Sequence, residues 1–232
     1  MGAAWKGRPS GTWGTVGCYS CQTYKHINAG EGGLFVTDDA QIAARAIMYS
    51  GSYMLYEKHL AGPPKEAFAL IRYETPNISG RMDNLRAAIL RPQLADLATQ
   101  CARWNDRYRA IEEGLRGTAG LRVIERPAEE TIVGSSLQFL LEDWAGETVQ
   151  ALLARCAARG VELKWFGGAE PVGFTSRYDS WRYIADMPQL PRTEAILSTL
   201  LDMRIPLTFS TEDCQLIGEV IIEVIESLQE AA

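Results

Sequence analysis

The stretch Ser20 to Gly33, SCQTYKHINAGEGG, places Lys25 between a segment rich in small residues and a turn rich in glycine. The preceding residues 14–21, GTVGCYSC, predict a short strand, and Leu34-Phe35-Val36 predicts a second one. Glycines at 30, 32 and 33 favour a turn between them. The sequence therefore predicts a pair of strands joined by a loop that carries Lys25.

Three interpretations of this loop compete on chemical grounds. The glycines could cradle a phosphate, but neither the Gly-Lys-Ser/Thr nor the GxGxxG pattern is present, and a strand follows them. Lys25 could be an ordinary exposed lysine, which is the commonest state of that residue. It could instead form a Schiff base, which requires partial burial to keep the amine neutral; neighbours such as Tyr24 and His26 could supply that burial.

Composition narrows the class of protein. The chain has 232 residues, a formal net charge of −6 and 47% hydrophobic residues, which indicates a globular protein and argues against a nucleic-acid partner. No apolar run is long enough to span a membrane, and the N-terminus lacks the apolar segment of a signal peptide, so we expect no membrane partner and a cytoplasmic location. Five scattered cysteines fit a reducing compartment. Cys18 and Cys21 match CxxC, yet they lack partners for zinc and should point to opposite faces of a strand.

Helical patterns follow the strand pair. Thr37-Asp38-Asp39 offers N-cap chemistry for a helix that carries Ile42, Ala43, Ala46 and Ile47 at helical spacing. Residues 50–80 contain several prolines and glycines and should be irregular. A long helix is expected from about residue 83 to residue 113, kinked or split by Pro92. One apolar stripe on it is most simply a core face; it comprises Leu97, Cys101, Trp104, Tyr108 and Ile111.

The remaining sequence, 121–232, alternates between strand and helix patterns. Residues 121–125, 135–141 and 161–166 predict strands, whereas 146–159 and 193–202 predict helices. In the helix 146–159, an inward face is expected from Val149, Leu152, Leu153 and Cys156. Ser210 and Asp213 are spaced as a capping box for a final helix. Its inward face is expected to comprise Leu216, Ile217, Val220, Ile221, Val224, Ile225 and Leu228.

Taken together, these motifs give the chain a family resemblance. The Ser20-to-Lys25 spacing and the Gly30-Glu31-Gly32-Gly33 turn resemble the signature of the DegT/StrS family of pyridoxal-phosphate-dependent sugar aminotransferases. Other segments are similar to family motifs along essentially the whole chain. They are Gly2-Ala3 with Trp5 and Gly7, Leu34 to Asp39, Arg81-Met82 to Ile89 with Gln93-Leu94, Leu190 to Glu194, and Ile205-Pro206-Leu207.

The resemblance implies roles for individual residues. Lys25 would be the catalytic residue, forming the Schiff base with pyridoxal 5'-phosphate and moving the proton between substrate and cofactor carbons. Ser20 would bind the cofactor phosphate. In the family an Asn of the neighbouring subunit also binds it, two residues before Arg-Met; Ser79 occupies that place here, and Asn77 is the nearest Asn. A lysine at position 25 argues against the dehydratases of the family, which carry His there.

The resemblance also implies an α/β fold, the C-terminal part of a fold-type I enzyme, because family members extend ahead of residue 1. The Asp that pairs with the pyridine nitrogen and the aromatic residue that stacks on the ring would lie in that preceding part. Residues 1–82 would complete the large cofactor-binding domain, 83–120 would form a long connecting helix, and 121–232 a small α/β domain.

Two functions follow as expectations. The first is an aminotransferase, or its C-terminal portion, that moves an amino group from glutamate or glutamine to a keto-sugar, which we expect to be nucleotide-linked, within a homodimer. The alternative is a catalytically inactive dimerisation or regulatory module derived from the C-terminal half of such an enzyme.

Overall fold

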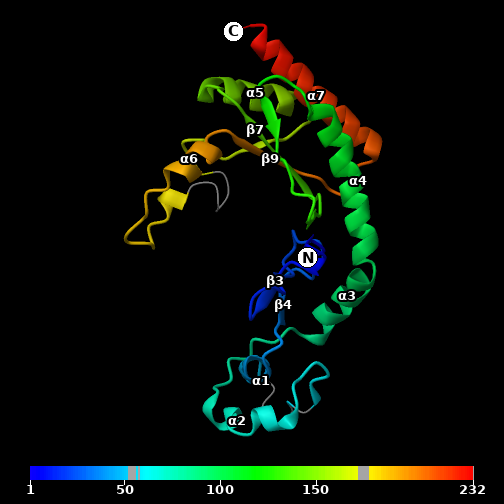
Figure 1. Ribbon diagram of the computed structural model, residues 1–232, viewed down its shortest axis with the longest axis vertical. Helices are drawn as coiled ribbons and strands as arrows, with labels where there is room; N and C mark the ends of the chain where they lie inside the picture. The colour runs from blue at the N-terminus through cyan, green and yellow to red at the C-terminus, as the bar shows by residue number, and fades with distance from the viewer. Residues whose placement is uncertain (52–55, 57, 172–177, 232) are drawn as a thin grey trace. The chain divides into compact units, whose positions relative to one another are not determined.

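A computed structural model describes residues 1–51, 56, 58–171 and 178–231 (Figure 1). The chain forms two compact units, which we describe separately. One comprises Met1–Thr99 and Ala128–Ile132, and the other Gln100–Pro127 and Val133–Ala232. The three-part division expected from the sequence stays a prediction.

The first unit contains small sheets and helices. Strands β1 (Ala4–Trp5), β2 (Arg8–Pro9) and β6 (Glu130–Thr131) form one antiparallel sheet, and β3 (Gly17–Ser20) pairs with β4 (Gly33–Val36) in another. The helices are α1 (Ala40–Tyr49), the 3-10 helix η2 (Lys65–Phe68), α2 (Ile71–Glu74) and α3 (Asn84–Ala95). The predicted strand pair around the lysine loop is therefore confirmed.

Helix α1 begins where the sequence predicts. Asp39 is its N-cap, and the carboxylate accepts hydrogen bonds from the backbone of Gln41 and Ile42. The buried residues are Ala44, Ile47 and Met48, which pack with Tyr56, Phe68 and Ile71. Of the residues that the sequence places at helical spacing, Ile47 is buried and Ile42, Ala43 and Ala46 are partly buried.

The long helical segment is split, as Pro92 suggests. Helix α3 ends at Ala95, and α4 (Leu97–Leu115) begins after Asp96. The predicted stripe on α4 is a packing face, since Tyr108 and Ile111 are buried and Leu97, Cys101 and Trp104 are partly buried. Trp104 also donates its indole N–H to the carbonyl of Ile205 at 3.0 Å.

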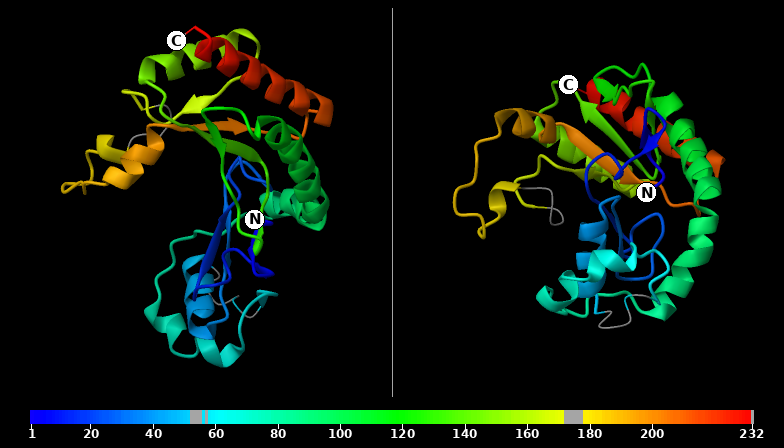
Figure 2. Two further views of the ribbon diagram at one scale, coloured as in Figure 1. Left: turned by 45° about the horizontal axis from the view of Figure 1, so that its top comes forward. Right: turned by 60° about the horizontal axis from the view of Figure 1, so that its bottom comes forward.

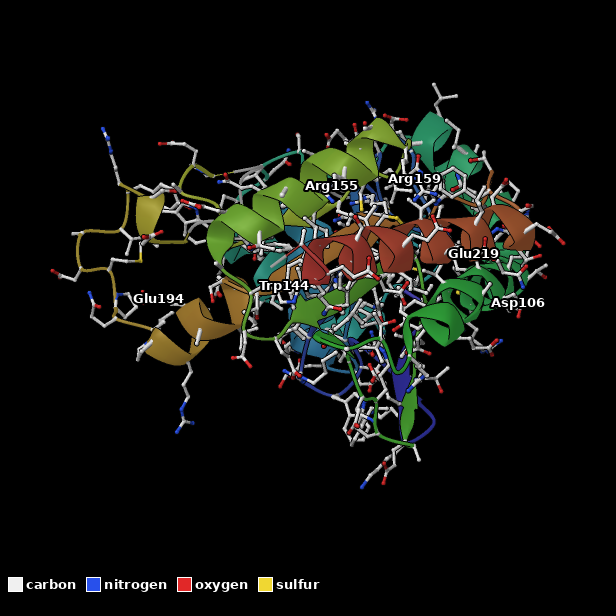
Figure 3. The ribbon with its side chains drawn as sticks, turned by 90° about the horizontal axis from the view of Figure 1, so that it is seen from above. Asp106, Trp144, Arg155, Arg159, Glu194 and Glu219 are labelled. Atoms are coloured by element: carbon white, nitrogen blue, oxygen red, sulfur yellow. The ribbon has the colours of Figure 1, made fainter. Side chains whose placement is uncertain are left out.

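The second unit is built on an antiparallel sheet in the order β5-β7-β9-β8. Its strands are β5 (Leu121–Val123), β7 (Ser136–Leu141), β8 (Lys164–Trp165) and β9 (Leu200–Arg204), and its further helices are α5 (Gly146–Ala158), η3 (Tyr178–Ser180), α6 (Pro191–Leu197) and α7 (Thr211–Gln229). Helices α5 and α7 lie together over the sheet (Figure 2). Figure 3 shows Arg155 and Arg159 on α5 beside α7, where they bond to Ser227 and Glu223 at 3.0 and 2.7 Å.

Two expectations for this unit were wrong. The predicted helix 193–202 ends at Leu197, and Leu200–Arg204 is strand β9, which pairs with both β7 and β8. Its alternating burial, with Leu201 and Met203 inside, is that of a strand. On α7 the capping box of Ser210 and Asp213 is present, but Leu216 is 57% exposed because the buried face is centred on Gly218 and Ile221.

On α5 the expected face holds at Val149, Leu152 and Cys156, which are buried, whereas Leu153 is only partly buried.

Among the described residues no helix combines the length and the apolar character needed to cross a membrane.

Candidate functional site

The lysine loop is a continuation of the β3–β4 hairpin. The strands pair from Gly17 with Val36 to Ser20 with Gly33. Beyond them, Cys21 donates its backbone N–H to the Gly32 carbonyl at 2.8 Å, and Thr23 donates to the Gly30 carbonyl at 3.0 Å. The stem of the loop is therefore closed by hydrogen bonds on both sides of Lys25.

Lys25 itself lies in a tight turn. Its backbone N–H donates to the Gln22 carbonyl at 2.9 Å, and its side chain is exposed. Within the described part of the chain, the ammonium makes no hydrogen bond or ion pair. The partial burial that the Schiff-base hypothesis invokes is not seen in the described part of the chain, where Tyr24 is also 67% exposed.

The residues that follow Lys25 are held individually. The Nδ1 atom of His26 lies 2.9 Å from the Met1 carbonyl oxygen. Ile27 is 2% exposed and packs with Cys21 and Leu90 in a small apolar cluster. The loop backbone thus has a buried anchor although the lysine side chain faces solvent.

Gln93 of α3 holds the next residue, Asn28. Its side-chain oxygen accepts the Asn28 backbone N–H at 2.9 Å, and its side-chain nitrogen donates to the Asn28 carbonyl at 2.8 Å. Sequence reasoning used Gln93 only as part of a family motif and missed this contact. The separation of 65 residues leaves no local pattern from which it could be found.

Ser20 lies at the end of β3, five residues before Lys25. It is exposed, and its Oγ accepts the Gln22 backbone N–H at 3.3 Å. Its hydroxyl hydrogen has no acceptor among the described residues, so it is available to donate to a ligand.

Asn77 forms a tight turn with Ser79. The Asn77 side-chain oxygen accepts the Ser79 backbone N–H at 2.7 Å and lies 3.3 Å from the Ser79 hydroxyl. Ser79 adopts a left-handed conformation with φ of 52°, and the turn packs against Gly51. Arg81 closes the same corner by donating to the Gly51 carbonyl at 2.6 Å. No described hydrogen bond joins Asn77 to Ser20 or Lys25.

The CxxC pair does not form a site with these groups. Cys18 is exposed, whereas Cys21 is fully buried and its pKa is raised by that burial. The described residues contain no cluster of three or more side chains that could hold a metal ion.

The donor set fits a phosphorylated aldehyde. Lys25 offers a primary amine, Ser20 offers a hydroxyl donor, and the Asn77 side-chain nitrogen has no partner among the described residues. An amine can capture an aldehyde covalently, and uncharged donors bind phosphate oxygens.

Residues 1–222 match the DegT/DnrJ/EryC1/StrS aminotransferase family. The chain belongs to this family. The resemblance seen in the sequence is thereby confirmed, and pyridoxal phosphate, the cofactor it implies, is that of the family.

Individual relatives support the same assignment. Over 210 residues the chain is 29% identical to dTDP-3-amino-3,4,6-trideoxy-alpha-D-glucose transaminase of Streptomyces venezuelae, covering 83% of this chain and 50% of that protein. A segment of 45 residues is 51% identical to L-glutamine:scyllo-inosose aminotransferase of Streptomyces griseus, covering 19% and 11% of the two chains. The chain thus spans half or less of these relatives.

Solved structures share the fold. The aminotransferase PseC of Helicobacter pylori, involved in the biosynthesis of pseudoaminic acid, superposes with a TM-score of 0.78 at 14% identity, covering 98% of this chain and 57% of that one. The expected fold class, α/β and part of a fold-type I pyridoxal-phosphate-dependent aminotransferase, is confirmed.

Proposed function

We propose that the chain is part of a pyridoxal-phosphate-dependent aminotransferase that transfers an amino group from glutamate or glutamine to a keto-sugar in amino-sugar biosynthesis. Family membership over residues 1–222 supports the reaction class. The relative from S. venezuelae supports a nucleotide-linked sugar, and the relative from S. griseus supports glutamine as donor.

The observation that carries the proposal is the presentation of Lys25. Its amine is exposed and unpaired within the described structure, whereas the backbone on either side is held by hydrogen bonds to Gln22 and by the buried Ile27. A lysine that must reach both an aldehyde and a substrate carbon needs a free side chain on a fixed backbone.

Each proposed residue has one task. Bound pyridoxal phosphate supplies the electrophilic aldehyde and the ring that withdraws electrons from the substrate carbon. Lys25 would hold the cofactor through its amine and would move a proton between the substrate carbon and the cofactor carbon. Ser20 would donate its hydroxyl hydrogen to the phosphate.

Asn77 is proposed as a second phosphate donor, acting on the site of the partner subunit in a homodimer. Its bond to the Ser79 backbone brings its carboxamide beside position 79, where the family resemblance expects an Asn. The turn uses only that oxygen, and the nitrogen remains available to donate.

Reductive trapping of pyridoxal phosphate on lysine tests the proposal in the full-length protein. The protein is incubated with pyridoxal phosphate, reduced with borohydride and mapped by mass spectrometry. We expect the adduct on Lys25, its loss in Lys25→Ala, and its retention in Lys58→Ala, which removes another exposed lysine.

Amino transfer is measured in parallel with glutamate or glutamine and dTDP-linked keto-sugars. We expect Lys25→Ala to abolish it and Ser20→Ala to raise the pyridoxal phosphate concentration needed for half-maximal rate. An absence of adduct and turnover, combined with loss of self-association on changing exposed residues of α4 such as Arg103 and Arg109, would favour the inactive dimerisation module instead.

A further inference from the structure

Gln93 makes a closed set of hydrogen bonds at the lysine loop. Its side-chain oxygen accepts from the Asn28 N–H at 2.9 Å, while its nitrogen donates to the carbonyls of Asn28 at 2.8 Å and Ile89 at 3.0 Å. The exchange with Asn28 reproduces the paired bonds of two facing residues in an antiparallel sheet. The Gln93 side chain therefore makes the pair of hydrogen bonds with Asn28 that a residue of a neighbouring strand would make.

Only a carboxamide of this length satisfies the arrangement. The oxygen must face an N–H and the nitrogen must face two carbonyl oxygens. Turning the amide over would oppose oxygen to oxygen and N–H to N–H, so the three partners define its orientation. A carboxylate at this position would face two carbonyl oxygens without a hydrogen to donate.

Asn28, which Gln93 binds, also makes a hydrogen bond to the backbone of Lys25. The Asn28 side-chain nitrogen lies 3.3 Å from the Lys25 carbonyl oxygen and donates to it, which closes a turn over the intervening residues. Ile27 between them is buried against Leu90, from the same helix as Gln93. Helix α3 thus holds the loop by an apolar contact and an amide pair.

We propose that Gln93 is a positioning residue for Lys25: its amide fixes Asn28, and through Asn28 the turn that presents the lysine amine to the cofactor. This role rests on the proposed function of Lys25. Gln93 itself touches neither the lysine amine nor any reacting atom.

The first test is amide hydrogen exchange at Asn28 in the full chain. Gln93→Met keeps the length of the side chain and removes all three bonds. We expect the hydrogen-exchange protection factor of the Asn28 N–H to fall about tenfold or more, because this N–H loses its acceptor and the neighbouring bonds of Gln93 are lost with it. Gln41→Met is the matched control, because Gln41 is exposed on α1 and its side chain has no described partner.

The second test measures capture of pyridoxal phosphate at Lys25 relative to the other lysines of the same molecule. This ratio removes effects of overall stability. We expect it to fall about fivefold or more in Gln93→Met and to stay unchanged in Gln41→Met. Asn28→Ala keeps the backbone pair with Gln93, so protection at position 28 should persist while capture at Lys25 falls.

The outcomes separate the two proposals. Unchanged hydrogen-exchange protection of the Asn28 N–H in Gln93→Met would show that Gln93 does not fix Asn28. Lost protection together with normal capture of pyridoxal phosphate at Lys25 would overturn only the positioning role. A wild-type protein that captures no cofactor at Lys25 would overturn the proposed function, and the positioning role with it.

Discussion

Gly32 is a glycine of the turn at which an added side chain should destabilise the lysine loop. Its φ is 130°, far outside the region that residues with a Cβ adopt readily. An added Cβ would also lie 2.5 Å from the terminal methyl group of Met82. Its carbonyl accepts the Cys21 N–H that closes the loop stem, so any relaxation of the backbone weakens this bond.

These terms set the expected magnitude for Gly32→Asn. A strained backbone conformation costs about 1–3 kcal/mol. The methyl group of Met82 is the flexible end of its side chain and can move at small cost. Weakening the Cys21 bond adds up to about 1 kcal/mol. We therefore expect Gly32→Asn to lower the free energy of unfolding by about 1–4 kcal/mol in total.

Gly30→Asn is the matched control because it introduces the same side chain two residues away. Gly30 has φ of 84° and no atom within 4 Å of an added Cβ. Asn tolerates left-handed backbone better than most residues, so the cost should stay below about 1 kcal/mol. Using Asn at both positions cancels the change in the unfolded chain.

Urea unfolding of both variants supplies the free energies, and hydrogen exchange at Cys21 reports the loop stem. We expect the Gly32 variant to unfold at lower urea concentration and to lose Cys21 protection, with little change in the Gly30 variant. Equal stability of the two variants would refute the assignment of strain to Gly32.

Three further outcomes concern the second unit. Gly134→Ala should destabilise it by about 1–3 kcal/mol in urea unfolding, because the added Cβ would overlap the Cβ of Tyr108, an atom that no rotamer change moves. The hydrogen bond with the Ser210 backbone lowers the pKa of Asp213 from its ordinary 3.8, so the charged cap stabilises the unit fully above pH 3.8 and is lost as the pH falls through the lower native pKa. The difference in unfolding midpoint between Asp213→Ala and the unchanged protein should therefore be full at neutral pH and shrink steadily as the solution is acidified below pH 3.8. Burial raises the pKa of Cys156 to about 11, so its alkylation by iodoacetamide at pH 8, followed by mass spectrometry, should proceed only as fast as the unit opens.

Local signals in the sequence predicted the ends of helices well. Asp39 caps α1 and Ser210 caps α7 with Asp213 as its partner, as their spacing indicates. Such caps depend on side chains and N–H groups within about one turn of helix, so the chain near the cap contains all the information required.

The assignment of residues 193–202 failed for the opposite reason. Leu200 and Leu201 continue the apolar pattern of α6, and helix and strand are hard to separate over so short a run. What decides the outcome is that β9 exchanges hydrogen bonds with β7, about sixty residues earlier, and with β8. A central strand is specified by its neighbours, which a local window does not contain.

In the candidate site, too, the sequence predicts local features and misses contacts between distant residues. Lys25 and Ser20 could be proposed from the sequence because the chemistry expected of them depends on residue type and spacing, which are visible there. Their support was missed because Gln93 binds the backbone N–H and carbonyl of Asn28, groups that almost every residue possesses. Almost any residue at position 28 could make these two backbone hydrogen bonds with Gln93, so the identity of residue 28 does not predict them. The side chain that specifies the contact is the carboxamide at position 93, and it is there that substitution should separate the fold of the loop from the chemistry of its lysine.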